Sequence, residues 1–149
     1  MNTISSSASE KHTKIKPNQV RSPDSHASCL VCGIDSLFGV QFNPQGGSVT
    51  AIVQASPLWQ GYTGVLHGGV ISTLLDAAMT HCLFDHGIEA MTASLKVRFL
   101  EPVPCTANLE IKATLLEQRR HVYLLNAELA SSGHCLARAE ARFIRSRKS

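Results

Sequence analysis

An aspartate and a pair of glycines have the clearest chemical potential in this sequence of 149 residues. The motif His67-Gly68-Gly69 precedes a run without glycine or proline that favours a helix, and Asp76 is the only formal charge in that run. The first turn of a helix has unpaired N–H groups that can bind an oxyanion, and glycine lets a substrate approach them closely. A backbone donor combined with an acid–base group suits acyl transfer to water.

The predicted helix extends from Val70 to Phe84 and has almost no polar face. Ser72, Asp76 and Thr80 are spaced four residues apart, so they lie along one side of it. We expect protein around the whole helix and therefore a largely buried Asp76. Because burying a polar group without partners costs roughly 2–7 kcal/mol, Asp76 is either paired with a structural donor or reserved for catalysis.

Apolar and polar residues alternate with the period of a β-strand on both sides of this helix. The connections between the later segments have hairpin length, which predicts antiparallel pairing. The helix itself is expected to end near Asp85-His86-Gly87. The predicted strands cover about residues 37–42, 48–55, 92–99, 107–115, 123–129 and 135–143.

The run from Gly61 to Met79 resembles the motif of PaaI-type acyl-CoA thioesterases of the hotdog fold. Segments 29–42 and 92–103 resemble other parts of that family, so the resemblance covers about residues 29–144. It implies an α+β hotdog fold, in which an antiparallel sheet of about six strands wraps around one long central helix. It also implies hydrolysis of a small or medium acyl-CoA thioester to free acid and coenzyme A, with no cofactor beyond the coenzyme A of the substrate.

The resemblance also implies residue roles. It assigns Asp76 as general base or nucleophile, and the N–H of Gly68 as donor to the thioester oxygen. His67 would hold the glycine elbow through its ring, or would be a capping or core histidine without a chemical role. Thr80 and Thr92 complete the catalytic candidates, although the Thr80 hydroxyl could instead bond a backbone carbonyl. The candidates for substrate binding are Gly69, Gln60, Gly61, Tyr62 and Ser94.

One position departs from the family pattern. Many relatives have Asn or Gln six residues before the histidine, where this sequence has Gly61 beside Gln60. Either Gln60 takes over that contact or the contact is missing, which leaves a non-catalytic acyl-CoA-binding protein as an alternative. A hotdog acyl-CoA hydratase is a second alternative, but it would need Asp76 and His81 to converge, and their spacing puts them about 140° apart around a helix.

Composition and charge limit the other function classes. The net charge of +3, without a dense basic stretch, does not favour nucleic acid, and no run is long enough to span a membrane. We expect a disordered polar tail over residues 1–27 and one domain over 28–146. The absence of a signal-like segment predicts a cytoplasmic protein. Because the sheet leaves open edges, we expect a homodimer or a dimer of dimers, and the family places each active site between two subunits.

The five cysteines are an odd number, which favours free thiols over a disulfide framework. Cys29 and Cys32 form a Cys-x-x-Cys motif with His26 nearby, which is half of a zinc site. No second ligand pair follows at the usual spacing, so a tight structural turn is the favoured interpretation and no metal is assigned. Metal binding and redox chemistry stay open as alternatives.

Overall fold

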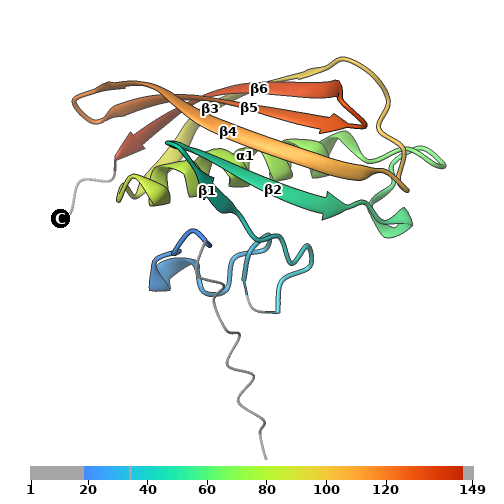
Figure 1. The fold of residues 1–149 in the computed structure, drawn as a ribbon, viewed down its shortest axis with the longest axis horizontal. Helices are drawn as coiled ribbons and strands as arrows, with labels where there is room; N and C mark the ends of the chain where they lie inside the picture. Colours follow the sequence, from blue (N-terminus) through green and yellow to red (C-terminus); the bar gives the residue numbers. More distant parts are fainter. Residues whose placement is uncertain (1–18, 34, 146–149) are drawn as a thin grey trace, which may run out of the picture.

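The computed structural model describes residues 19–33 and 35–145. In this part of the chain, one α-helix packs beneath one curved sheet of six strands (Figure 1). This is the α+β architecture predicted from the sequence. The elements are η1 (Asp24–His26), β1 (Asn43–Gln45), β2 (Ser48–Gln54), η2 (Pro57–Trp59), α1 (Gly68–Asp85), β3 (Ala90–Phe99), β4 (Asn108–Arg119), β5 (Val122–Ser131) and β6 (His134–Arg145).

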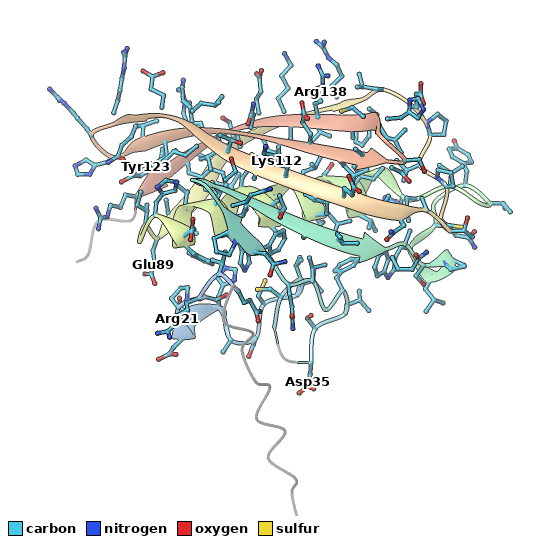
Figure 2. The ribbon with its side chains drawn as sticks, in the orientation of Figure 1. Arg21, Asp35, Glu89, Lys112, Tyr123 and Arg138 are labelled. Carbon is cyan, nitrogen blue, oxygen red and sulfur yellow. The ribbon has the colours of Figure 1, made fainter. Side chains whose placement is uncertain are left out.

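The strands form a single antiparallel sheet in the order β1-β2-β4-β5-β6-β3. One face of the sheet is polar, and Arg138 projects from it, away from α1 (Figure 2). The other face is apolar because alternate residues of each inner strand point toward α1. The two edges differ in length, since β1 has three residues and includes Pro44, whereas β3 has ten.

The helix α1 is buried over most of its surface, as its lack of charge predicts. It lies against β2, β3, β4, β5 and β6. The helix begins at the His67 cap and ends before Gly87, whose φ of +72° is suited to glycine. None of the helices within residues 19–33 and 35–145 combines the length and hydrophobicity that crossing a bilayer requires. The buried residues of α1 are Ile71, Leu74, Leu75, Ala77, Ala78, Met79, His81, Cys82 and Leu83.

A segment before the sheet, which we call the N-terminal segment (residues 19–33 and 35–42), covers the side of α1 that the sheet leaves open. It is blue in Figure 1 and lies below the helix, and Figure 2 places Arg21 and Asp35 on this side of the molecule, opposite Arg138. The Val20 N–H donates to the carbonyl of Phe42 at 2.9 Å, and both side chains are buried. The side chains of the segment therefore complete the core.

One prediction about this segment is wrong. Within the predicted polar tail, Val20 is buried and His26 is half-buried, while residues 1–18 lie outside the described part of the chain. The predicted strand over 37–42 is an irregular segment instead, because its backbone groups form hydrogen bonds within the N-terminal segment. For example, the Val40 N–H donates to the Val31 carbonyl at 2.9 Å. The first strand comes later and forms a hairpin with β2, turning at Gly46 and Gly47, which have φ of +56° and +87°.

Strand β3 also differs from the expectation of one buried face. Eight of its ten residues are exposed, and Ala90 and Val97 are half-buried. A bulge between Thr92 and Ser94 interrupts its pairing with β6. The apolar Met91 and Phe99 are 72% and 53% exposed, so this edge presents hydrophobic surface together with unpaired backbone groups.

Candidate functional site

The start of α1 forms the glycine elbow that the sequence predicted. His67 is the N-cap, and its Nδ1 accepts the Gly69 N–H at 2.8 Å, so the imidazole does hold the elbow. The Gly68 N–H has no acceptor within residues 19–33 and 35–145. The ring of Phe99, at the end of β3, lies beside Gly68. A Cβ atom added to Gly68 would be 3.4 Å from Cζ of Phe99. One unpaired amide thus faces the outside of the elbow at the positive end of the helix dipole.

Asp76 pairs with Thr92 across the space between α1 and β3. The Thr92 hydroxyl donates to Oδ1 of Asp76 at 2.6 Å, whereas Oδ2 has no hydrogen-bond partner in the described part of the chain. Asp76 is half-buried in the single chain rather than largely buried as predicted, because β3 leaves its outer side open. The carboxylate is therefore oriented by one hydroxyl and has one oxygen free for a proton.

The two halves of the predicted site do not meet within one chain. Gly68 and Asp76 are eight residues apart on α1, which at 1.5 Å per residue is about 12 Å along the helix axis. A thioester carbonyl that accepts a hydrogen bond at about 3 Å from one amide cannot also present its carbon to a water held by that carboxylate. The amide and the carboxylate of one helix therefore do not combine in one site within the chain, contrary to the combination that the sequence suggested.

The remaining catalytic candidate and the residues before the elbow have local partners. The Thr80 hydroxyl donates to the Asp76 carbonyl at 3.0 Å, which is the structural alternative recognised from the sequence. Gln60 bonds within its own loop, where its Oε1 accepts the Gly64 N–H at 3.1 Å. A side chain at Gly61 would lie 3.3 Å from Cα of His67, so the loop is closed tightly there.

The aromatic and polar candidates around the elbow are spread apart. Tyr62 is 89% exposed. Trp59 packs edge-on against Phe38, with 4.9 Å between ring centroids, and so anchors the N-terminal segment. Ser94 lies on the edge strand in a shallow hollow of about 430 Å³ that Lys96 and Arg142 also line.

His81 faces away from Asp76, which removes the basis for the hydratase alternative. Its ring stacks on Phe42 with 4.4 Å between centroids, and its Nδ1 bonds the Ala77 carbonyl at 2.8 Å. Burial lowers the pKa of His81 to about 4, so the ring is neutral at neutral pH. It cannot act as an acid toward a substrate held by Asp76.

All five cysteines are free thiols, as the odd number predicted. Burial, followed by the neighbouring Cys29, raises the pKa of the Cys32 thiol to about 12. Redox-active Cys-x-x-Cys motifs have a lowered pKa, so this environment argues against the redox interpretation. His26, which the sequence analysis placed near the motif, lies beside Cys32 in the structure, with 3.6 Å between Nδ1 and Sγ.

Comparison with known proteins identifies the domain. The sequence model of the thioesterase superfamily matches residues 63–134, which include the elbow, α1 and β3 to β5. The chain is 28% identical over 127 residues to the acyl-coenzyme A thioesterase THEM4 of Bos taurus, a match that covers 81% of this chain and 52% of the bovine protein. The chain thus spans about half the length of that relative.

Two solved structures show the same fold. The PaaI protein of E. coli superposes with a TM-score of 0.69 at 17% identity, covering 75% of this chain and 83% of the other. A thioesterase of Streptococcus pneumoniae, solved with coenzyme A, gives 0.69 at 18% identity, covering 73% and 90%. The predicted fold is confirmed, and the family model that matches is the one that the sequence motif predicted. Residues 63–134 therefore resemble the thioesterase superfamily, and the described domain has the hotdog fold.

Proposed function

We propose that this protein hydrolyses an acyl-CoA thioester at a site that two copies of the chain share. One copy supplies Asp76 and Thr92, and the Gly68 N–H comes from the partner. The observation that carries this proposal is the pairing of a half-buried carboxylate with a hydroxyl donor, on a helix whose first amide is unpaired. The acyl-coenzyme A thioesterase named among its relatives supports the same reaction.

The geometry suits Asp76 as a general base. Thr92 occupies Oδ1, so Oδ2 is the oxygen that takes a proton from water. The water oxygen then bonds to the thioester carbon, and the carbonyl oxygen becomes an oxyanion that accepts the Gly68 N–H. When the tetrahedral intermediate collapses, the carbon–sulfur bond breaks and coenzyme A leaves as a thiolate, which takes up the proton.

The open edge of the sheet is the reason to place the second half of the site on another copy. An antiparallel pairing of two β3 strands about a two-fold axis between Leu95 and Lys96 would set Phe99 of one strand near Thr92 of the other. Phe99 lies beside Gly68, and Thr92 bonds Asp76. The same pairing would therefore bring Gly68 of the partner subunit close to Asp76, and it would cover the exposed apolar residues of the edge.

The pneumococcal protein of the same fold provides further support for placing Asp76 and Thr92 in one site. Its structures include one variant with an aspartate changed to alanine and one with a threonine changed to alanine, at positions sixteen residues apart. Asp76 and Thr92 have the same separation in this chain. The matching distance along the sequence is a further reason to assign the two residues to one reaction.

The proposed reaction is tested by incubating the purified protein with short-chain, medium-chain and aromatic acyl-CoA thioesters. Because the protein has five free thiols, coenzyme A release should be followed by chromatography rather than by a thiol dye. We expect turnover with at least one of these classes. Saturable binding without any release of coenzyme A would contradict the proposal and would favour the non-catalytic binding protein.

Changing Thr92 to valine should reduce kcat about 10-fold with little change in KM, because it removes one hydrogen bond to the carboxylate without touching the acyl group. Thr92→Ser keeps the hydroxyl and should retain most of the activity. Steady-state kinetics of the two variants give the comparison. A purely structural role for Thr92 would lower the thermal stability of the valine variant and leave kcat per folded protein unchanged.

Changing Leu95 to lysine should separate the copies, because it adds positive charge next to Lys96 on both sides of the proposed two-fold axis. We expect the mass in solution, measured by light scattering, to fall to the 16.1 kDa of one chain. Ile52→Lys is the matched control, since Ile52 is a 73% exposed apolar residue on β2. An unchanged mass for the Leu95 variant would place the contact between copies elsewhere.

A further inference from the structure

The Cys-x-x-Cys motif and His26 form a cluster of metal-ligating side chains at the far end of α1 from the elbow. The two sulfur atoms and a ring nitrogen of His26 all lie within 4.8 Å of one another, and all three residues are half-buried. The His26 Nδ1 is 3.6 Å from Sγ of Cys32. No part of the proposed hydrolytic reaction uses these residues.

The distance of 3.6 Å between Nδ1 of His26 and Sγ of Cys32 is the one that a tetrahedral zinc ion would require. Zinc binds thiolate sulfur at about 2.3 Å and imidazole nitrogen at about 2.0–2.1 Å. With a tetrahedral angle between them, the two ligand atoms are about 3.6 Å apart. His26 and Cys32 already have this separation, so the side chains need little rearrangement to hold the ion.

The backbone around the motif is shaped to present both sulfurs. The Gly33 N–H donates to the carbonyl of Cys29 at 2.9 Å, closing a tight turn. A Cβ atom at Gly33 would lie 2.6 Å from that carbonyl oxygen, so only glycine fits without a shift of the backbone. The Val31 N–H points at Sγ of Cys29 at 3.4 Å and so helps to fix the position of that sulfur.

We propose that His26, Cys29 and Cys32 bind a zinc ion, with a water molecule as the fourth ligand. Two thiolates and an imidazole are soft and borderline donors that select zinc over magnesium or calcium. The ion with two thiolates and a neutral imidazole has no net charge, which suits a half-buried position. Each zinc that binds displaces one proton from each thiol, so two protons are released.

The expected role of the ion is to fasten the N-terminal segment to α1. The His26 ring packs edge-on against Phe84 and His81 of α1, with centroid distances of 4.9 and 5.9 Å. Phe84 is sixteen residues after Gly68, which is about 24 Å along the helix axis. The metal is therefore a structural element, and its presence is independent of the proposed thioesterase reaction.

The full-length reduced protein should bind one equivalent of Co²⁺, used as a coloured substitute for zinc, and show thiolate-to-cobalt charge-transfer absorption. Zinc should then displace the cobalt. Cys29→Ser and Cys32→Ser should each abolish this absorption. The matched control is Cys135→Ser, which removes another half-buried thiol from β6 and should leave the absorption unchanged. Because the wild-type titration needs no variant, poor folding of a serine variant does not prevent the test.

Thermal unfolding provides the second measurement. Zinc far above its Kd should raise the Tm by about 10 °C, and a chelator should reverse the increase. His26→Ala should bind cobalt more weakly and show a smaller increase. The proposal is overturned if the reduced wild-type protein, with all five thiols titratable after unfolding, binds neither metal. It is also overturned if the purified protein has a Cys29–Cys32 disulfide that persists under cellular reducing conditions.

Discussion

Replacing Asp76 with asparagine should lower kcat/KM for thioester hydrolysis by about 10³-fold, because it removes the base that takes the proton from water. The amide has the shape of the carboxylate and still offers an oxygen to the Thr92 hydroxyl, so the contact of 2.6 Å between α1 and β3 can persist. Steady-state kinetics on the best substrate of the acyl-CoA panel measure the effect. The substrate should still bind, because the change leaves the Gly68 amide in place.

The control for this change is Asp85→Asn at the other end of α1, where the carboxylate is exposed and has no place in the proposed site. It should leave kcat/KM within about twofold of wild type. Circular dichroism and Tm of both variants show whether the fold is kept. An Asp76→Asn protein that is folded and fully active would assign Asp76 a structural role and end the proposed mechanism.

Mixing two inactive variants should restore activity if the site is shared. Gly68→Val should block the approach to the unpaired amide and cost about 10²–10³-fold in kcat. In a heterodimer of Gly68→Val with Asp76→Asn, one of the two sites contains both native residues. Co-expression with two different tags should therefore recover about one quarter of the wild-type activity in the mixed population.

The purified homodimers of each variant, mixed without subunit exchange, are the control and should stay inactive. A site contained within one chain would give no recovery in the heterodimer either, since every chain then lacks one essential residue. That outcome would contradict the shared site and leave the Asp76 experiment valid by itself. The two experiments thus test the chemistry and the assembly separately.

Periodicity made the helix and most of the sheet predictable. The absence of charge between Val70 and Phe84 led to a buried helix, and the structure begins it only two residues earlier, at Gly68. The alternation in β2 and in β4 to β6 placed the buried faces correctly, because side chains on one face of a sheet recur every second residue. The elbow at His67 followed from the chemistry of helix starts.

The N-terminal segment could not be predicted in the same way. Val20, Val31, Val40 and Phe42 are buried but are few and far apart in a polar segment, so no helical or strand period marks them. Their hydrogen bonds join residues that are far apart in the sequence, and polar neighbours hide the few apolar contacts. The contact of His26 with Cys32 depends on this irregular path, so the sequence could indicate the three candidate ligands but not how close they lie.

The distance of about 12 Å along the helix axis between Gly68 and Asp76 was also not apparent from the sequence motif. A motif in which two functional groups are close together along the chain suggests one site, but a helix separates them by its rise. The alternation in β3 did not indicate its exposure, because its residues alternate like those of a strand with one covered face. Alternation shows which residues share a face, and it does not show whether the same chain covers that face.

The unequal edges of the sheet determine how far assembly can proceed. Strand β1 is only three residues long and its central residue is Pro44, which has no N–H to offer an incoming strand. Strand β3 is long and accessible, so growth by edge pairing can start at one side only. Once that side is occupied, no comparable edge is left in the described sheet, and end-to-end polymerisation into fibres is blocked by the shape of the fold itself.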